Sequence, residues 1–143
     1  MTFPTSTRLT IPPVMSIQIE DTMDVMIARS TARRAAGLLG FAASSRAQIA
    51  TAVAVLADII VTAGVPQTIH LNGIQNGAQI GMQMWCTAPW LAAAEPANAL
   101  IALRSKLADM TDEVAVESGK VPRIVMVLWL NSDRSAPDSV SAY

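Results

Sequence analysis

The longest apolar stretch of the chain, from Ser45 to Gly64, repeats its hydrophobic residues at helical spacing. One stripe recurs at steps of four, three and four residues, and smaller apolar residues widen it around most of the circumference. Ser44 or Ser45 is suited to cap the start, and Gly64 is suited to end the helix. Because Asp58 interrupts a short and alanine-rich run, we expect a buried core helix, not a membrane span. The stripe consists of Ile49, Val53, Leu56 and Ile60.

The pattern before this helix predicts an arm, one strand and one helix. Residues 1–13 are rich in Thr, Ser and Pro and are expected to form a loosely ordered arm. Residues 14–19 alternate in polarity, which predicts a strand. A helix is expected over residues 23–39, capped by Asp21, Thr22 or Asp24, with Arg29, Arg33 and Arg34 towards solvent.

After Pro66 the period changes to two, which is typical of strands. Residues 68–74 and 78–85 are predicted to form a hairpin through a type I′ turn at Asn76-Gly77. A loop is expected from Cys86 to Pro96, followed by a helix over residues 97–109 and strands over 113–117 and 123–130. Residues 131–143 lack apolar periodicity and are expected to be a disordered tail.

This order of elements predicts an α+β protein. We expect a two-layer sandwich, in which helices cover one face of a mixed, largely antiparallel sheet. The domain is predicted to span residues 14–130, between the arm and the tail.

Composition and charge narrow the functional classes. The chain is 52% hydrophobic and 15% charged, with a mean hydropathy of +0.39, so either the core is large or part of the surface is an interface. A formal charge of −1 provides no field that attracts nucleic acid or anionic membranes, and neither is an expected partner. One Cys and one His make no internal disulfide and no metal cluster, and no secretory leader is recognisable. These features favour a cytoplasmic protein without cofactors.

The segment from Ala28 to Gly64 resembles a known family. Its sequence, ARSTARRAAGLLGFAASSRAQIATAVAVLADIIVTAG, is similar to the opening of anti-sigma-factor serine kinases and switch kinases, which belong to the GHKL superfamily of ATPases. The resemblance extends over about residues 14–130, because Asp112–Ser118 is similar to the first part of the family's C-terminal hairpin. It implies the histidine-kinase-like ATPase fold, with the helix of residues 45–63 beside a nucleotide cavity.

The residues that handle ATP in this family are replaced here. On the central helix, the family's catalytic Glu and its Mg²⁺-binding Asn correspond to Val55 and Ile59. The family's Asp-x-Gly-x-Gly motif corresponds to Cys86, Ala88 and Trp90. No glycine lies between Gly81 and Gly119, where a phosphate-binding lid is expected. Phosphoryl transfer depends on positioning and on charge neutralisation by Mg²⁺, so the resemblance implies a pseudoenzyme. Asp58 is expected to point away from the old site.

The resemblance therefore implies a non-catalytic protein-interaction module in bacterial signalling or transcription control. The implied partners are a sigma factor, an anti-sigma antagonist or a related regulator, and a homodimer is expected. One alternative is a small-molecule sensor that uses the vacated pocket. Another is an active ATP-dependent serine kinase, which requires that every motif above be misaligned.

Several apolar side chains are candidates for a partner or ligand surface. They are Met82, Met84, Trp85, Trp90 and Leu91. For Trp90 we favour a structural role, as a plug that fills the space beside Val55 and Ile59. His70 is expected to be a solvated or structurally hydrogen-bonded side chain, and Cys86 a small buried apolar residue. The three arginines at 29, 33 and 34 are expected to form either a solvated helix face or a contact for an acidic partner.

Overall fold

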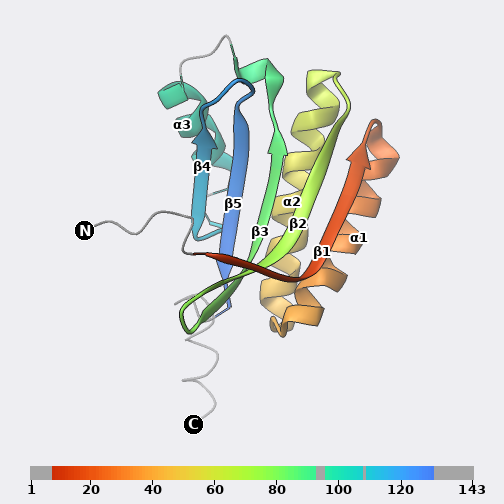
Figure 1. Ribbon diagram of the computed structural model, residues 1–143. Coiled ribbons are helices and arrows are strands. Elements are labelled where there is room, and N and C mark those ends of the chain that lie inside the picture. The colour runs from red at the N-terminus through yellow and green to blue at the C-terminus, as the bar shows by residue number, and fades with distance from the viewer. Residues whose placement is uncertain (1–7, 93–95, 108, 131–143) are drawn as a thin grey trace, which may run out of the picture.

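The protein is a two-layer sandwich in which three helices cover one face of a five-stranded sheet (Figure 1). The computed structural model describes residues 8–92, 96–107 and 109–130. The strand order is β1-β2-β3-β5-β4, and each pair of neighbours is antiparallel. The predicted α+β sandwich is therefore confirmed. The predicted tail at 131–143 and the first part of the predicted arm lie outside the described residues.

Helix α1 (Thr22–Leu39) begins at a capping box. The Asp21 side chain accepts a hydrogen bond from Met23 N at 3.0 Å, and Asp24 Oδ2 accepts one from Asp21 N at 3.2 Å. These bonds satisfy N–H groups that have no partner within the helix. The buried face of α1 consists only of alanines, which lets the helix pack closely on its neighbours. They are Ala28, Ala32, Ala35 and Ala36.

Helix α2 (Ala43–Ala63) is the central helix that the apolar pattern predicts. Gly64 ends it with a φ of 78°, as expected, because this left-handed conformation suits glycine. The predicted serine cap is wrong. The N-cap is Ala42, which makes no side-chain hydrogen bond, and Ser45 is buried inside the first turn. The pattern located the helix but not its first residue.

Strand β1 (Leu9–Ile19) begins earlier than the sequence predicts. Leu9–Ile11 pair with β2 (Gln67–Asn76), and pairing resumes at Val14 after a register shift. The prolines at 12 and 13 were expected to keep this segment in a loose arm. They are tolerated because β1 is an edge strand, where a missing N–H costs little.

The β2–β3 hairpin has a different turn from the predicted one. Asn76 pairs with Gln79, the first residue of β3 (Gln79–Thr87), so the central turn residues are Gly77 and Ala78. Gly77 has a φ of 62°, and no described residue other than glycine has a positive φ. A positive first residue and a negative second one indicate type II′ and not type I′.

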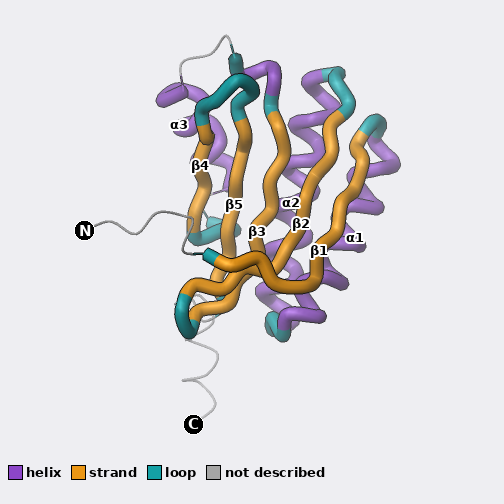
Figure 2. The backbone as a smooth tube through the Cα atoms, viewed as in Figure 1, coloured by secondary structure: helices purple, strands orange, loops and turns teal. Residues whose placement is uncertain are grey.

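The second half of the chain completes the sheet (Figure 2). A 3₁₀ turn, η2 (Pro89–Leu91), and helix α3 (Pro96–Leu107) connect β3 to β4 (Glu113–Glu117). Strand β5 (Arg123–Trp129) then inserts between β3 and β4. The predicted loop from Cys86 is wrong at its start, since Cys86 and Thr87 still pair with β5.

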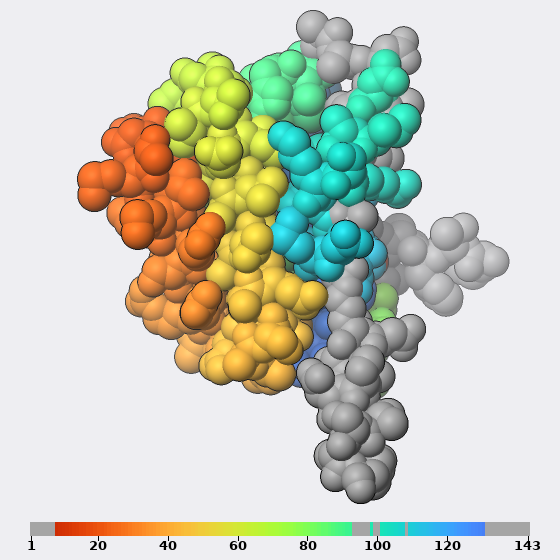
Figure 3. Space-filling view, turned by 180° about the vertical axis from the view of Figure 1, so that it is seen from behind, coloured from red at the N-terminus to blue at the C-terminus, as the bar shows by residue number. Residues whose placement is uncertain are grey.

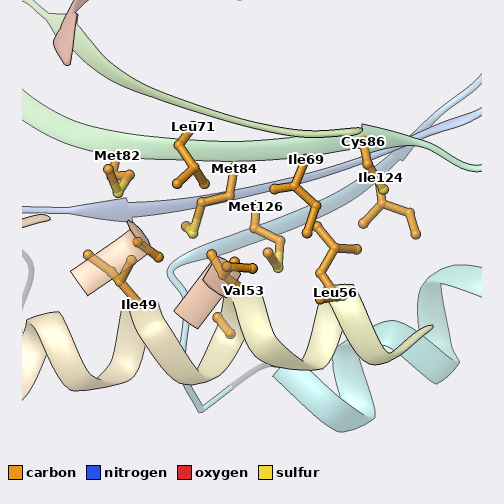
Figure 4. Packing of buried hydrophobic residues seen from close by; sticks show 14 of the residues in the cluster. Ile49, Val53, Leu56, Ile69, Leu71, Met82, Met84, Cys86, Ile124 and Met126 are labelled. Atoms are coloured by element: carbon orange, nitrogen blue, oxygen red, sulfur yellow. The ribbon is translucent and has the colours of Figure 1, made fainter. Parts of the chain in front are cut away.

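The main core lies between α2 and the inner face of the sheet (Figure 4). In that view Ile49, Val53 and Leu56 point from α2 towards the strands. Among the described helices, α2 alone is long and apolar enough to cross a membrane, but nine of its residues are buried in this sandwich. We therefore interpret α2 as a core helix of the sandwich.

Candidate functional site

A groove runs along the outer face of the helical layer. Figure 3 shows this face, with α2 (yellow) between α1 (orange) and α3 (cyan). One part of the groove, of about 550 Å³, touches all three helices, and a second part, of about 440 Å³, continues along α1. The two parts share Val25 and Arg29, so they form one continuous surface. We call it the helical groove. Its lining is Val25, Met26, Arg29, Ser30, Arg33, Thr51, Ala54, Val55, Asp58, Ile59 and Lys106.

The central part of the helical groove is apolar where the resemblance implies ATP chemistry. Val55 and Ile59 are half-buried and line the groove on α2. Aliphatic side chains neither bind Mg²⁺ nor activate an attacking group. The expectation that Asp58 points away from this site is wrong. Asp58 lines the groove too, because the groove is wide enough to include the exposed flank of α2.

Basic side chains border the helical groove. Three of the lining residues are basic and one, Asp58, is acidic. Arg29 and Arg33 line the groove from α1, and Lys106 lines it from α3. Arg34, next in sequence, does not line it. None of these cations makes an ion pair or a side-chain hydrogen bond with the residues that the structure describes.

Trp90 lies beside Ile59 but does not fill the space around it. Together with residues of α3 and β5, the two side chains border a small, mainly apolar pocket of about 170 Å³. Val55 does not line this pocket and faces the helical groove instead. The predicted plug is thus only partial, because the short 3₁₀ turn holds the half-buried Trp90 at one end of α2. The other lining residues are Leu91, Ala102, Leu103, Lys106 and Ile124.

Cys86 and Ala88 are part of the core. Both side chains are fully buried, and Cys86 lies beside Ile124 on the inner face of the sheet (Figure 4). Burial raises the pKa of the Cys86 thiol from 9.0 to about 12, so the thiol stays protonated at neutral pH. A protonated, inaccessible thiol is a poor nucleophile, and the structural interpretation of Cys86 is confirmed.

The proposed surface of Met82, Met84, Trp85, Trp90 and Leu91 is not one surface. Met82 and Met84 are fully buried and point from β3 towards α2 (Figure 4). Trp85 lies on the opposite face of the sheet, because side chains alternate along a strand. Trp90 and Leu91 lie near α3, at the pocket described above. The spacing of 82 and 84 correctly indicated a shared face, but that face is the core.

The outer face of the sheet carries a stacked cluster that sequence reasoning missed. The His70 and Trp85 rings stack with centroids 4.1 Å apart, and the Arg123 guanidinium lies 5.0 Å from the Trp85 centroid. Ser16 Oγ is 3.3 Å from His70 Nδ1, and Arg123 pairs with Glu117. His70 was expected to be structural, and these contacts confirm it. Cross-strand pairing would have predicted the cluster only with the register of β2 and β3 in hand.

A second cluster fastens the start of β1 across the same face. In Figure 1 this segment, in dark red, crosses in front of the sheet. Arg8 Nη2 is 3.1 Å from both Glu113 carboxylate oxygens, and its guanidinium lies 5.2 Å from the Trp129 ring centroid. Trp129 Nε1 donates to Glu113 at 2.8 Å. The indole also packs over Gly81, where a Cβ would lie 2.7 Å from the ring.

Neither metal-binding residues nor known relatives indicate a function for this chain. In the described part of the chain, no group of three or more His, Cys, Asp or Glu residues is placed to hold a metal ion. No protein-family model matches the sequence, and no curated protein matches it. The case for a function therefore depends on the groove, its charges and the side chains at the positions where the resemblance implies ATP binding.

Proposed function

We propose that this chain is a non-catalytic, cytoplasmic module that binds a protein partner through the helical groove. The observation that carries the proposal is the pairing of an apolar floor at Val55 and Ile59 with a border of unpaired cations at Arg29, Arg33 and Lys106. These exposed cations make no ion pair with the described residues of the monomer. An acidic partner that covers the groove would pair with them and bury the apolar floor.

The charge of the groove selects the occupant. We propose an amphipathic helix with an apolar stripe and acidic flanks, because such a helix buries the floor and pairs with the border. On α1 the lining runs from Val25 to Arg33, a rise of about 12 Å or roughly two turns, which suits a short helix. The resemblance favours a helix of a sigma factor, or of a regulator that opposes an anti-sigma factor, as the natural form of this ligand.

A designed peptide tests the groove directly. The probe is a fluorescein-labelled helical peptide of about four turns, with leucines at i, i+3 and i+4 spacing and glutamates on both flanks. We expect saturable binding by fluorescence anisotropy that weakens steeply with added salt. Arg33→Glu should weaken binding about tenfold or more, because it replaces an attraction by a repulsion.

Arg34 provides the matched control. It adjoins Arg33 and has the same charge, but it does not line the groove. Arg34→Glu should change the affinity by no more than about threefold, the size of a long-range charge effect. Equal losses of peptide affinity in the two variants would reject the groove as the docking site. So would the absence of saturable peptide binding to the native chain.

The two edges of the sheet differ in a way that supports a homodimer. Edge strand β4 is short, and each of its ends is a glutamate, Glu113 and Glu117. Edge strand β1 is eleven residues long; Pro12, Pro13 and a register shift interrupt its first part, but residues 14–19 contain neither a charged residue nor a proline. Uncharged edges without proline are the ones that pair with other strands. We propose that two copies pair along residues 14–19 of their β1 edges around a two-fold axis.

Helix α1 adds apolar surface on that side. Met23, Ile27 and Leu38 are 74%, 53% and 67% exposed, and they lie on the flank of α1 that faces away from α2. Light scattering should find a dimer, and Ile27→Glu should shift it to a monomer. Met26→Glu is the control, because Met26 lines the groove; it should keep the dimer and weaken the peptide. Monomer at all concentrations would reject the dimer but not the groove.

A small-molecule sensor remains a second candidate because of the pocket beside Trp90. Its walls are mostly aliphatic, from Ile59, Leu103 and Ile124, and its volume of about 170 Å³ suits only a small apolar ligand. Xenon or benzene binding, detected by shifts of the Ile124 methyl resonances, would support this function. An unchanged spectrum would leave the groove as the only candidate.

A further inference from the structure

The outer face of the sheet contains a cleft that the proposed function does not use. It has a volume of about 320 Å³, which is at the lower end of small-molecule sites. Thr10 and Val14 of β1 form one side, and Trp85 and Arg123 form the other. Its base includes Asn72 and Gln83, which pair across β2 and β3. We call it the sheet cleft.

Two amide side chains in the sheet cleft are only half satisfied. Asn72 is 7% exposed, and its Nδ2 donates to Gly73 O at 3.1 Å and to Gln83 Oε1 at 3.3 Å. The carbonyl of Gly73 fixes this orientation, since a flipped Asn72 would set two acceptors against each other. Among the described residues, neither Asn72 Oδ1 nor Gln83 Nε2 has a hydrogen-bond partner.

A buried acceptor without a partner is uncommon and requires an explanation. Most buried polar groups are paired, and those that are not often face a bound molecule. Here the two amides line one cleft and are joined by one hydrogen bond, which leaves an acceptor on Asn72 and a donor on Gln83. A primary amide presents the complementary pair, because one of its N–H groups points to the same side as its C=O, whereas the two groups of a trans secondary amide point in opposite directions.

The other walls of the sheet cleft define the rest of the ligand. Arg123 uses Nη2 for Glu117 and makes no other hydrogen bond with the described residues, so its remaining N–H groups are free for a carboxylate. Val14 and Val125 provide apolar contacts. Stacking on Trp85 is less available, because His70 from β2 and Arg123 from β5 already lie against that ring.

We propose that the sheet cleft binds a small carboxylate that carries a primary amide, such as the half-amide of a dicarboxylic acid. The amide N–H donates to Asn72 Oδ1, and the amide C=O accepts from Gln83 Nε2. The carboxylate pairs with Arg123, and the aliphatic chain between the two groups lies against Val14 and Val125. This site is on the opposite face of the molecule from the helical groove, and its occupancy does not depend on the proposed protein partner.

The test uses glutaramate, the half-amide of glutaric acid, as the probe and the full chain, labelled with ¹⁵N. We expect saturable shifts of the side-chain amide signals of Asn72 and Gln83 and of the Trp85 indole N–H. Gln83→Leu should weaken the probe about three- to tenfold, the usual loss for a neutral hydrogen bond. Arg123→Gln should weaken it about tenfold or more, because a charged pair is lost. Gln79→Leu, an exposed position at the start of β3, should have no effect.

Two related compounds separate the parts of the proposal. Glutaramide lacks the carboxylate, and butanoate lacks the amide; each should bind at least about tenfold more weakly than the probe. If the amides face only water, the probe causes no saturable shift at concentrations up to about 10 mM, and the site is rejected. Equal binding of all three compounds, or an effect of Gln79→Leu as large as that of Gln83→Leu, would also overturn it.

Discussion

Arginines on the two outer faces of this protein have opposite surroundings. On the sheet face, Arg8 and Arg123 each pair with a glutamate and lie over an indole ring. On the helical face, Arg29 and Arg33 have no ion pair with any described residue and border an apolar groove. The first pair of arginines serves the fold of the monomer. The charges of the second pair stabilise no contact among the described residues of the monomer.

This difference is what favours the helical face for a protein partner. Surface ion pairs contribute little, but an unpaired cation beside apolar surface provides both steering and specificity when an acidic partner arrives. On this face Val55 and Ile59 occupy the positions where the sequence resemblance implies a catalytic Glu and an Mg²⁺-binding Asn.

The strongest test of the sheet face is Trp129→Ala. Trp129 is 8% exposed and forms a small cluster with Ile74 and Val127 on the outer face. Removing a buried aromatic and leaving a cavity should lower the free energy of unfolding by about 3 to 5 kcal/mol, measured by urea denaturation. A loss under about 1 kcal/mol would mean that this cluster does not fasten the start of β1.

Trp90→Gly examines the helical side in the same way. Trp90 is only half-buried and leaves a pocket beside Ile59, so the cost should be about 2 to 3 kcal/mol, less than for a fully buried aromatic. Equilibrium denaturation gives the value. A loss as large as that of Trp129→Ala would restore Trp90 as a complete plug.

Cys86, on the inner face of the sheet, provides a pH-dependent reference. The pKa of its thiol in the folded protein, about 12, lies above the usual 9.0. Below pH 9 the thiol is protonated in both the folded and the unfolded chain, so its ionisation does not change the free energy of unfolding. Above pH 9 the unfolded chain loses this proton while the folded chain keeps it, and stability should fall by about 1.4 kcal/mol per pH unit. Comparison with Cys86→Ala isolates the effect, because other groups titrate alike in both proteins. Parallel pH profiles would contradict a buried thiol.

The smallest expected changes in stability come from substitutions of single arginines. Arg8→Ala should lower stability by about 1 kcal/mol, since it removes a partly exposed ion pair and a cation–π contact. Arg33→Ala should change stability by less than about 0.5 kcal/mol, because no described residue pairs with it. Thermal and urea unfolding of both variants measure the difference. Equal losses of stability in the two variants would contradict the distinction between paired arginines on the sheet face and unpaired ones on the helical face.

The apolar pattern predicted elements well and surfaces poorly. It located α2, the hairpin and the last two strands because their periodicity and the stop at Gly64 are local signals. It missed the first part of β1, where pairing with distant Gln75 and Gly73 overrides the prolines. It also assigned Met82 and Met84 to a surface, because alternation shows that two residues share a face but not which face is covered.

The candidate sites depend still more on distant contacts. The cations of α1 were visible in the sequence, yet their lack of partners follows only from the arrangement of α1, α2 and α3. The sheet cleft joins Thr10, Asn72 and Arg123, which are far apart in the chain. No local spacing predicts such a combination.

We propose that α2 borders a protein-binding groove and not a nucleotide site. The most direct test is a calorimetric titration of the chain with ATP and Mg²⁺. Because Val55 and Ile59 supply neither the carboxylate nor the carboxamide that the resemblance implies, we predict no heat of binding at nucleotide concentrations up to about 1 mM. Binding of ATP with a dissociation constant in the micromolar range, abolished by EDTA, would contradict this proposal.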